Sequence, residues 1–422
     1  NGHKEVLPQP TITHPDIRIE IYPDESAVDL QGRYHLVNRT DAAIESVHVY
    51  VTPDIDTRSI AVDREAAPGV TDEDVGYRIL TLAQPLQPGE SMRLRFDLGY
   101  RQRGFPNSGI PTSVVGNGTV LNRRWLPFVG YQPFFELAGD EARERHGLGP
   151  QPTLPAADGD EGRRYRQPWR DADLVQVDMI IGTSADQIAI TPGVLRREWM
   201  ENGRRYFHYA TERPESFGAT VISGRYAVVE DRWNDVALSI FHHPRHAYNL
   251  ESFTGAMKAA LQYFSAQFGP YPYDEMRIAE VPRYDSYGRA HPFTIEFTEN
   301  FFLTRPQDGQ FDQVFFGTAH EIAHTWWGGQ VRSASDVRGG QGFVSETLAN
   351  YSAMMVTEKT FGMEAARKVY DYQMNRYLMR RSDLARDIPL LESQDQAYIS
   401  YRKGAVAMYT LREHVWEEGL HA

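Results

Sequence analysis

The spacing of the apolar residues changes near residue 245 of this 422-residue chain, and no other feature of the sequence limits its fold as strongly. Before that point apolar and polar residues alternate, as at Ile17, Ile19 and Ile21, and alternation is typical of strands with one buried face. Asn202-Gly203 separates two further segments of this kind, and this dipeptide favours the tight turn of a hairpin. We therefore expect an N-terminal, antiparallel β-rich domain of a saddle or sandwich type.

After that point, apolar residues recur every three or four positions from Phe253 to Phe268. This period predicts one face of a helix, which should end at Gly269-Pro270. We expect a short strand at 276–281, a further extended segment at 293–297, and helices over the rest of the chain. This order predicts a second domain that is α+β and mainly helical.

We place the domain boundary near residue 240, so that the domains comprise residues 1–240 and 241–422. Residues 138–172 are charged and rich in Gly and Pro, and their lack of periodicity predicts a long polar surface loop. The chain begins with Asn1 and ends inside a helical pattern. We therefore expect a fragment whose second domain is truncated at its C-terminus.

The composition excludes several classes of protein. The formal net charge of −13 argues against nucleic acid as a partner. No apolar run is long enough to span a membrane and no export signal opens the chain, so we expect the chain as given to be soluble. Because the sequence contains no cysteine, any metal site must use His, Asp or Glu.

The segment from His320 to His324 reads His-Glu-x-x-His in a helical context. Two histidines four residues apart lie on one face of a helix and can bind one zinc ion, while Glu321 would lie beside the open coordination position. Zinc lowers the pKa of bound water to about 7, and a carboxylate can accept the proton that is released. We therefore expect hydrolytic chemistry, with Glu321 as general base and not as a ligand.

A catalytic zinc site usually takes three ligands from the protein, and Glu346 is the candidate for the third. It opens a predicted helix, 346–361, and the glycines between 328 and 342 allow the chain to turn back toward the histidines. The alternative is a glutamate that only favours the helix dipole. The neighbouring His-Glu-x-x-His motif favours the ligand.

These residues together resemble the aminopeptidase N family of gluzincin metallopeptidases, whose catalytic domain is thermolysin-like. The likeness also extends to other segments, namely Trp326-Trp327-Gly328, Tyr263-Phe264, Phe268-Gly269, Tyr271-Pro272-Tyr273, Val281-Pro282 and Tyr401-Arg402-Lys403-Gly404. The last segment resembles the Tyr-x-Lys-Gly motif, whose tyrosine binds the oxyanion in the family. The resemblance implies this role for Tyr401, with Tyr398 as the second candidate.

The family also has a Gly-x-Met-Glu-Asn loop that binds the substrate backbone and its free α-amine. The corresponding segment is Glu296-Phe297-Thr298-Glu299-Asn300, in which the Gly and Met are replaced. The resemblance implies that Glu299 binds the amine, with Asn300 beside it. Gln132 and Asn122 are weaker candidates for the contribution of the N-terminal domain to this site.

The spacing between His324 and Glu346 is longer than is usual in the family. This longer spacing, the sequence Ser345-Glu346-Thr347-Leu348-Ala349 and the segment from Leu126 to Gln132 resemble those of a bacterial subgroup. In that subgroup the peptidase is fused to permease segments of ABC transporters. That resemblance implies an extracytoplasmic domain of a membrane protein, although a cytoplasmic location stays open.

We expect an aminopeptidase that contains one zinc ion and acts on peptides. Two alternatives stay open: an extracytoplasmic zinc-bearing domain that senses or binds peptides for a transporter, with little turnover, and a zinc endopeptidase with an open cleft. The altered amine loop favours the first alternative and the intact Glu321 opposes it. An absent C-terminal cap domain would permit the second.

Overall fold

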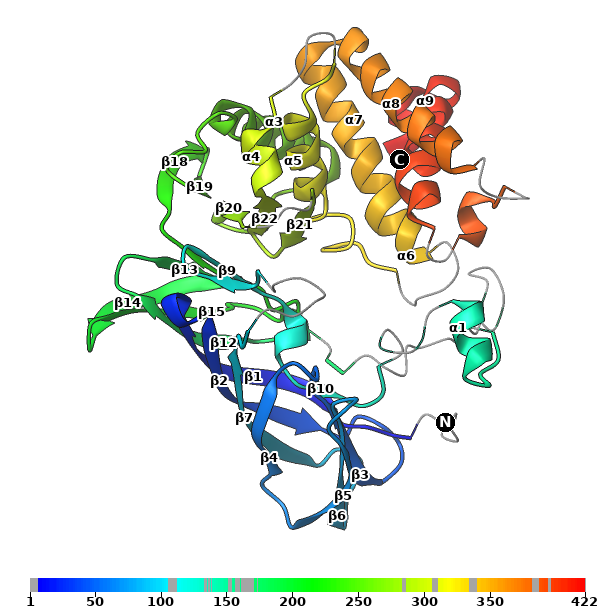
Figure 1. Ribbon diagram of the computed structural model, residues 1–422. Coiled ribbons are helices and arrows are strands. Elements are labelled where there is room, and N and C mark those ends of the chain that lie inside the picture. The colour runs from blue at the N-terminus through cyan, green and yellow to red at the C-terminus, as the bar shows by residue number, and fades with distance from the viewer. Residues whose placement is uncertain are drawn as a thin grey trace. The chain divides into compact units, whose positions relative to one another are not determined.

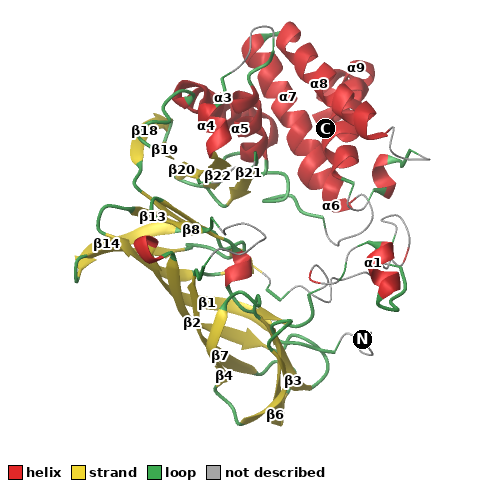
Figure 2. Cartoon of the chain, viewed as in Figure 1, coloured by secondary structure: helices red, strands yellow, loops and turns green. Residues whose placement is uncertain are grey.

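The computed structural model forms two compact units, which are residues 1–143, 168–226 and 281–283, and residues 144–167, 227–280 and 284–422. The structure describes residues 7–104, 112–132, 135, 137, 139–150, 154–155, 160, 171–172, 174–282, 286–305, 310–333, 340–381, 387–393 and 396–421. Figures 1 and 2 show strands through the first unit and mainly helices in the second.

A seven-stranded sheet dominates the first unit, in the order β14-β15-β12-β1-β2-β7-β4. These strands are β1 (Thr11–Tyr22), β2 (Ala27–Val37), β4 (Asp56–Val62), β7 (Ser91–Arg101), β12 (Asp178–Ser184), β14 (Val194–Glu201) and β15 (Arg204–Ala210). Their pairs are antiparallel, except that β1 and β12 run parallel. The sheet is thus mixed at one pair of strands that lie far apart in the sequence.

Two four-stranded sheets share one apolar core with this sheet. They have the orders β10-β3-β6-β5 and β13-β17-β9-β8. Their strands are β3 (Ile44–Tyr50), β5 (Ala66–Asp72), β6 (Tyr77–Leu86), β8 (Val114–Val115), β9 (Gly118–Leu121), β10 (Phe128–Val129), β13 (Ile188–Ile190) and β17 (Val221–Gly224), and a small separate sheet pairs β11 (Leu174–Val175) with β16 (Glu215–Ser216). The common core contains Ile19, Leu30, Val49 and Leu121, among others. Sheets that share their inner faces in this way confirm the sandwich-like, β-rich prediction.

The predicted hairpin at Asn202-Gly203 joins β14 to β15. Both residues have positive φ, 50° and 75°, as a type I′ turn requires. The prediction is confirmed.

The second unit contains a five-stranded sheet in the order β18-β19-β20-β22-β21. Its strands are β18 (Ala227–Trp233), β19 (Val236–His242), β20 (Glu275–Val281), β21 (Gly288–His291) and β22 (Thr294–Thr298). The β19–β20 pair is parallel, and the helix α3 (Leu250–Phe268) makes the crossover between these strands. Since β21 ends the strand order, it is an edge strand.

Helices make up most of the second unit (Figure 1), and several of them contribute to one apolar core. They are α4 (Glu299–Leu303), α5 (Gln313–Ala323), α6 (Gly340–Gly342), α7 (Leu348–Phe361), α8 (Met363–Arg381) and α9 (Gly404–His421), with the π-helical turns η4 (Phe343–Thr347) and η6 (Tyr398–Lys403). Phe253, Met257, Leu261 and Phe264 of α3 are fully buried in this core, which confirms the predicted stripe.

Three features differ from the sequence expectations. The strands β18 and β19 lie in the second unit, because the compact units divide after Tyr226. Within 138–172, residues Asp140–Arg145 form the helix α1, whereas much of the predicted loop lies outside the described residues. Glu346 does not open a regular helix but lies within η4.

Candidate metal centre and active site

The helix α5 carries the first half of the metal-binding motif. Its first turn is capped by Asp312, whose Oδ1 accepts the backbone N–H groups of Val314 and Phe315 at 2.9 and 3.0 Å. The helix ends at Ala323, so that His320 lies in its last turn and His324 is its C-cap. The spacing of four residues therefore keeps both imidazoles on one face, as predicted.

The structure brings His320, His324 and Glu346 together. The two imidazole Nε2 atoms lie 3.2 Å apart, and the Glu346 Oε2 lies 3.5 Å from that of His320 and 3.6 Å from that of His324. A tetrahedral zinc ion with bonds of 2.0–2.1 Å separates its ligand atoms by about 3.3–3.4 Å. The three atoms are therefore spaced as ligands of one small cation, and these residues could bind a metal ion.

The hydrogen bonds around these atoms support the same interpretation. The Nδ1 of His324 lies 3.2 Å from the backbone oxygen of Trp327; since a carbonyl only accepts, Nδ1 carries the proton and Nε2 keeps its lone pair for a metal. Ser345 Oγ donates to Glu346 Oε1 at 3.0 Å. The other oxygen, Oε2, is buried without a hydrogen-bond partner in the described part of the chain. A bound cation would satisfy it.

The charge state of Glu346 suits this role. Burial alone raises the pKa of this carboxyl, but the neighbouring His320, His324 and Tyr401 favour the charged form and lower the pKa to about 2. A carboxylate that stays ionised is a competent metal ligand.

The environment of the Glu321 carboxyl differs from that of the Glu346 carboxyl. Burial raises its pKa to about 7, and the Glu346 and Glu296 carboxylates add to this rise, while His324 and the backbone N–H of Ala290 oppose it. Gly288 leaves room for the side chain, because a Cβ there would lie 2.8 Å from Glu321 Oε1. A carboxylate with a pKa near neutrality can accept and release a proton.

Tyr401, and not Tyr398, lies at the metal cluster. The Tyr401 ring centroid is 5.8 Å from that of His320, and its hydroxyl interacts with the Glu346 carboxylate. Burial, followed by the charge of Glu346, raises the Tyr401 pKa well above its usual range, so that the phenol keeps its proton. Tyr398 instead stacks on Tyr377 at a centroid distance of 6.4 Å.

Glu299 and Asn300 open α4. No contact among the described residues joins either side chain to His320, His324 or Glu346. Glu299 instead lies near Glu280, whose pKa is raised by burial and, to a smaller degree, by the charge of Glu299. The role of Glu299 in amine binding therefore stays a prediction.

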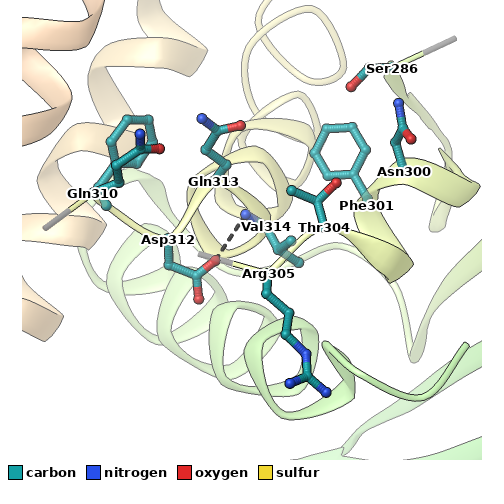
Figure 3. A pocket seen from close by; sticks show the side chains of 10 residues that line it. Ser286, Asn300, Phe301, Thr304, Arg305, Gln310, Asp312, Gln313 and Val314 are labelled. Atoms are coloured by element: carbon teal, nitrogen blue, oxygen red, sulfur yellow. Dashed lines mark hydrogen bonds between the residues drawn. The ribbon is translucent and has the colours of Figure 1, made fainter. Parts of the chain in front are cut away.

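Asn300 lines a pocket of about 200 Å³ with Thr304, Arg305 and Asp312 (Figure 3). The pocket lies at the N-terminal end of α5, where Figure 3 shows Asp312 bonded to the N–H of Val314. His320 lies seven residues after the start of this helix. The start of α5 and His320 are therefore about 10 Å apart along the helix axis.

The two candidates from the N-terminal domain have local roles in the first unit. The buried Gln132 side chain donates to the backbone oxygen of Val129 at 3.2 Å, and the Asn122 side chain accepts the N–H of Arg124 at 3.0 Å. Their proposed share in an amine site is untested.

The sequence interpretation missed the edge strand β21 and the buried Glu296. The backbone N–H of Ala290 in this strand lowers the Glu321 pKa, and β21 lies at the edge of its sheet. Glu296 is 1% exposed, and its carboxylate lies 3.9 Å from Arg289 and 3.8 Å from His291. Gly288 was the available signal, because a glycine in a strand often marks a close approach.

Comparison with known proteins agrees with this geometry. Residues 248–422 match the model of the peptidase family M1 domain. This part of the chain is therefore similar to M1 peptidase domains. The match bears out the predicted class of zinc peptidase hydrolase. No curated protein is significantly similar in sequence.

Solved structures of M1 enzymes share the fold of the whole chain. An M1 zinc metallopeptidase from Deinococcus radiodurans is 16% identical with a TM-score of 0.64, and the alignment covers 98% of this chain and 85% of that one. A mutant from the same organism, bound to a Tyr-Ser-Ala substrate, has 16% identity, the same coverage and a TM-score of 0.62. This likeness confirms the predicted succession of a β-rich domain and a thermolysin-like, mainly helical domain.

Proposed function

We propose that this M1 peptidase domain is an aminopeptidase, which removes residues from the free N-termini of peptides. The observation that carries the proposal is the convergence of three metal-ligand atoms from His320, His324 and Glu346 with Glu321 and Tyr401 beside them. One bound zinc ion would supply a Lewis acid that lowers the pKa of water and polarises the substrate carbonyl.

The side chains of the site divide the remaining chemistry. Glu321 accepts the proton of the attacking water and passes it to the leaving amine, a task that suits a carboxyl with a pKa of about 7. Tyr401 keeps its proton and donates a hydrogen bond to the oxygen on which negative charge develops. The open edge of β21 offers backbone groups to which an extended peptide can pair.

The free amine requires a negatively charged partner, and two carboxylates compete for that role. The family resemblance assigns it to Glu299, with Asn300 as a second substrate contact. The electrostatic coupling of Glu296 to Glu321, and its cross-strand position opposite Arg289 of β21, favour Glu296 as the second candidate. Glu299 would explain a requirement for a free amine, because an acetylated substrate would leave its carboxylate unpaired. The Glu296 carboxylate, in contrast, already lies 3.9 Å from Arg289 and 3.8 Å from His291.

Matched fluorogenic substrates test the proposal. Each aminoacyl amide is paired with its N-acetyl form, and each pair is offered to the zinc-loaded wild-type chain and to Glu321→Gln. We expect cleavage of the free-amine substrates only, and its loss in the variant. Glu299→Gln and Glu296→Gln then identify the anchor, because the correct substitution raises KM for free-amine substrates and reduces the preference over acetylated ones.

The same panel separates the two alternatives. Equal cleavage of acetylated and free substrates, or of internal bonds in longer peptides, would indicate an endopeptidase. Peptide binding without turnover by a chain that holds zinc would indicate a sensing or binding domain.

We also propose an extracytoplasmic location in a parent protein with transporter-permease segments. The resemblance of residues 345–349 and 126–132 to the permease-fused bacterial subgroup supports this assignment. Within the described residues, no helix has the length and apolar character needed to cross a membrane. Protease accessibility of the full-length protein in intact spheroplasts tests the location: digestion of this domain is expected, and protection would contradict it.

A further inference from the structure

Glu346 and Tyr401 are carried by the two π-helical turns η4 and η6, which contact each other. Turns of this kind are rare and are often found at functional sites. Neither side chain is held by a regular helix, so other contacts must fix the position of the tyrosine relative to the glutamate. Two buried polar connections link the turns.

The first connection is a relay of side chains through α7 and α8. Arg402 Nη1 donates to Gln373 Oε1 at 2.7 Å, Gln373 Nε2 donates to Asn350 Oδ1 at 3.3 Å, and Asn350 Nδ2 donates to the backbone oxygen of Glu346 at 3.0 Å. Asn350 and Gln373 are 2% and 0% exposed. The relay thus runs from the neighbour of Tyr401 to the main chain of the third metal ligand.

The chemistry of its ends fixes the orientation of this relay. A guanidinium group only donates and a carbonyl only accepts, so both amides between them must present oxygen toward Arg402 and nitrogen toward Glu346. All three hydrogen bonds therefore run in one direction, and such chains polarise and strengthen one another in a buried setting. The cationic end makes the first bond a charge-assisted one.

The second connection joins the two turns directly. The Thr347 hydroxyl, which is fully buried, donates to the backbone oxygen of Ser400 at 2.7 Å. Gly404 makes this approach possible, because a Cβ at that position would lie 2.2 Å from Thr347 Oγ1. The glycine that follows Lys403 is thus required by the close contact of the turns.

We propose that Thr347, Asn350, Gln373 and Arg402 are positioning residues, which hold the Tyr401 hydroxyl at a fixed place beside Glu346 and the reacting carbonyl. The inference rests on the proposed peptidase function and deepens it. None of the four needs to touch the substrate. Their effect should therefore fall on kcat and depend on Tyr401.

Thr347→Val tests the proposal because it keeps the shape of the side chain and removes the hydroxyl, and Thr347→Ser restores the donor as the matched control. Gln373→Met interrupts the relay at a residue far from the ligands. We expect Thr347→Val to lower kcat by about 10- to 100-fold, the usual effect of supporting residues around a metal site. KM and the zinc content should change little, and Thr347→Ser should recover most of the rate.

A double-mutant cycle with Tyr401→Phe decides whether the effect passes through the tyrosine. We expect Thr347→Val and Gln373→Met to have almost no further effect on kcat once the tyrosine hydroxyl is absent. The same fall in both backgrounds, or a wild-type rate in Thr347→Val, would overturn the proposal.

Crystal structures of the zinc-loaded wild type and Thr347→Val provide a readout that does not need activity. If the wild type cleaves no peptide, the proposed function fails, whereas the positioning proposal is still decided by these structures. We expect the Tyr401 hydroxyl to move away from Glu346 in the variant. An unchanged tyrosine would overturn the positioning role.

Discussion

Two clusters in the second unit contain the same kinds of side chain and differ in how their polar atoms are satisfied. The first is the metal cluster of His320, His324 and Glu346. The second, which we call the histidine–glutamate pair, consists of His246 and Glu280. Glu280 is 3% exposed, and its two oxygens contact the His246 ring and the backbone N–H of His243.

The difference shows what distinguishes a binding site from a structural contact. The carboxylate of the pair has a partner for each oxygen. Glu346 Oε2, in contrast, is buried without a hydrogen-bond partner among the described residues and faces two imidazole nitrogens. Among the described residues, only the metal cluster places three ligand atoms within reach of one ion. Residue type alone does not separate the clusters, but hydrogen-bond satisfaction does.

The largest expected effect comes from removing one histidine of each cluster. His324→Ala should abolish tight zinc binding and lower kcat/KM by at least roughly 10³-fold, because a bound zinc ion would lower the pKa of the attacking water and polarise the substrate carbonyl. His246→Ala should leave both properties near those of the wild type. Metal analysis and peptide hydrolysis of the two variants measure this contrast. Equal losses of zinc and of kcat/KM in both variants would contradict it.

Glu321→Gln should retain the zinc and lose turnover. The amide cannot accept a proton, so we expect kcat to fall by about 10²- to 10⁴-fold, while the three ligands stay intact. Steady-state kinetics beside a zinc assay checks both parts. If the variant also lost its metal, Glu321 would belong to the ligand set.

Tyr401→Phe should lower kcat by about 10²- to 10³-fold, the typical loss of one oxyanion donor, with little change in KM. Tyr398→Phe is the matched control, since that ring stacks on Tyr377 away from the metal cluster. Similar rates for both variants would show that the tyrosine hydroxyl beside His320 does not act in the reaction.

The smallest expected effect belongs to the histidine–glutamate pair. Glu280→Leu should lower the free energy of unfolding by about 1–3 kcal/mol, because His246 and the His243 N–H lose a buried partner. The zinc content and kcat should not change. Chemical denaturation measures the first quantity, and a loss of zinc in this variant would contradict the structural role of the pair.

The sequence predicts the part of this site on one helix from local patterns, whereas it identifies Glu346 and Tyr401 without revealing the turns that carry them. His320, Glu321 and His324 follow from the period of one helix, and Gly269 and Asn202-Gly203 follow from turn chemistry. The π-helical setting of Glu346 and the relay through Gln373 depend on packing between α7, α8 and η6, and neither leaves a local pattern. The family motif led to Glu299, but no sequence pattern predicted that the strand β21 lies beside Glu321.

Anomalous diffraction at the zinc absorption edge, on crystals of the zinc-loaded chain, would locate the bound metal. We expect one strong peak among the Nε2 atoms of His320 and His324 and the Oε2 of Glu346, with no peak at His246 and Glu280. A peak at the histidine–glutamate pair, or no peak at the three ligand atoms, would contradict it.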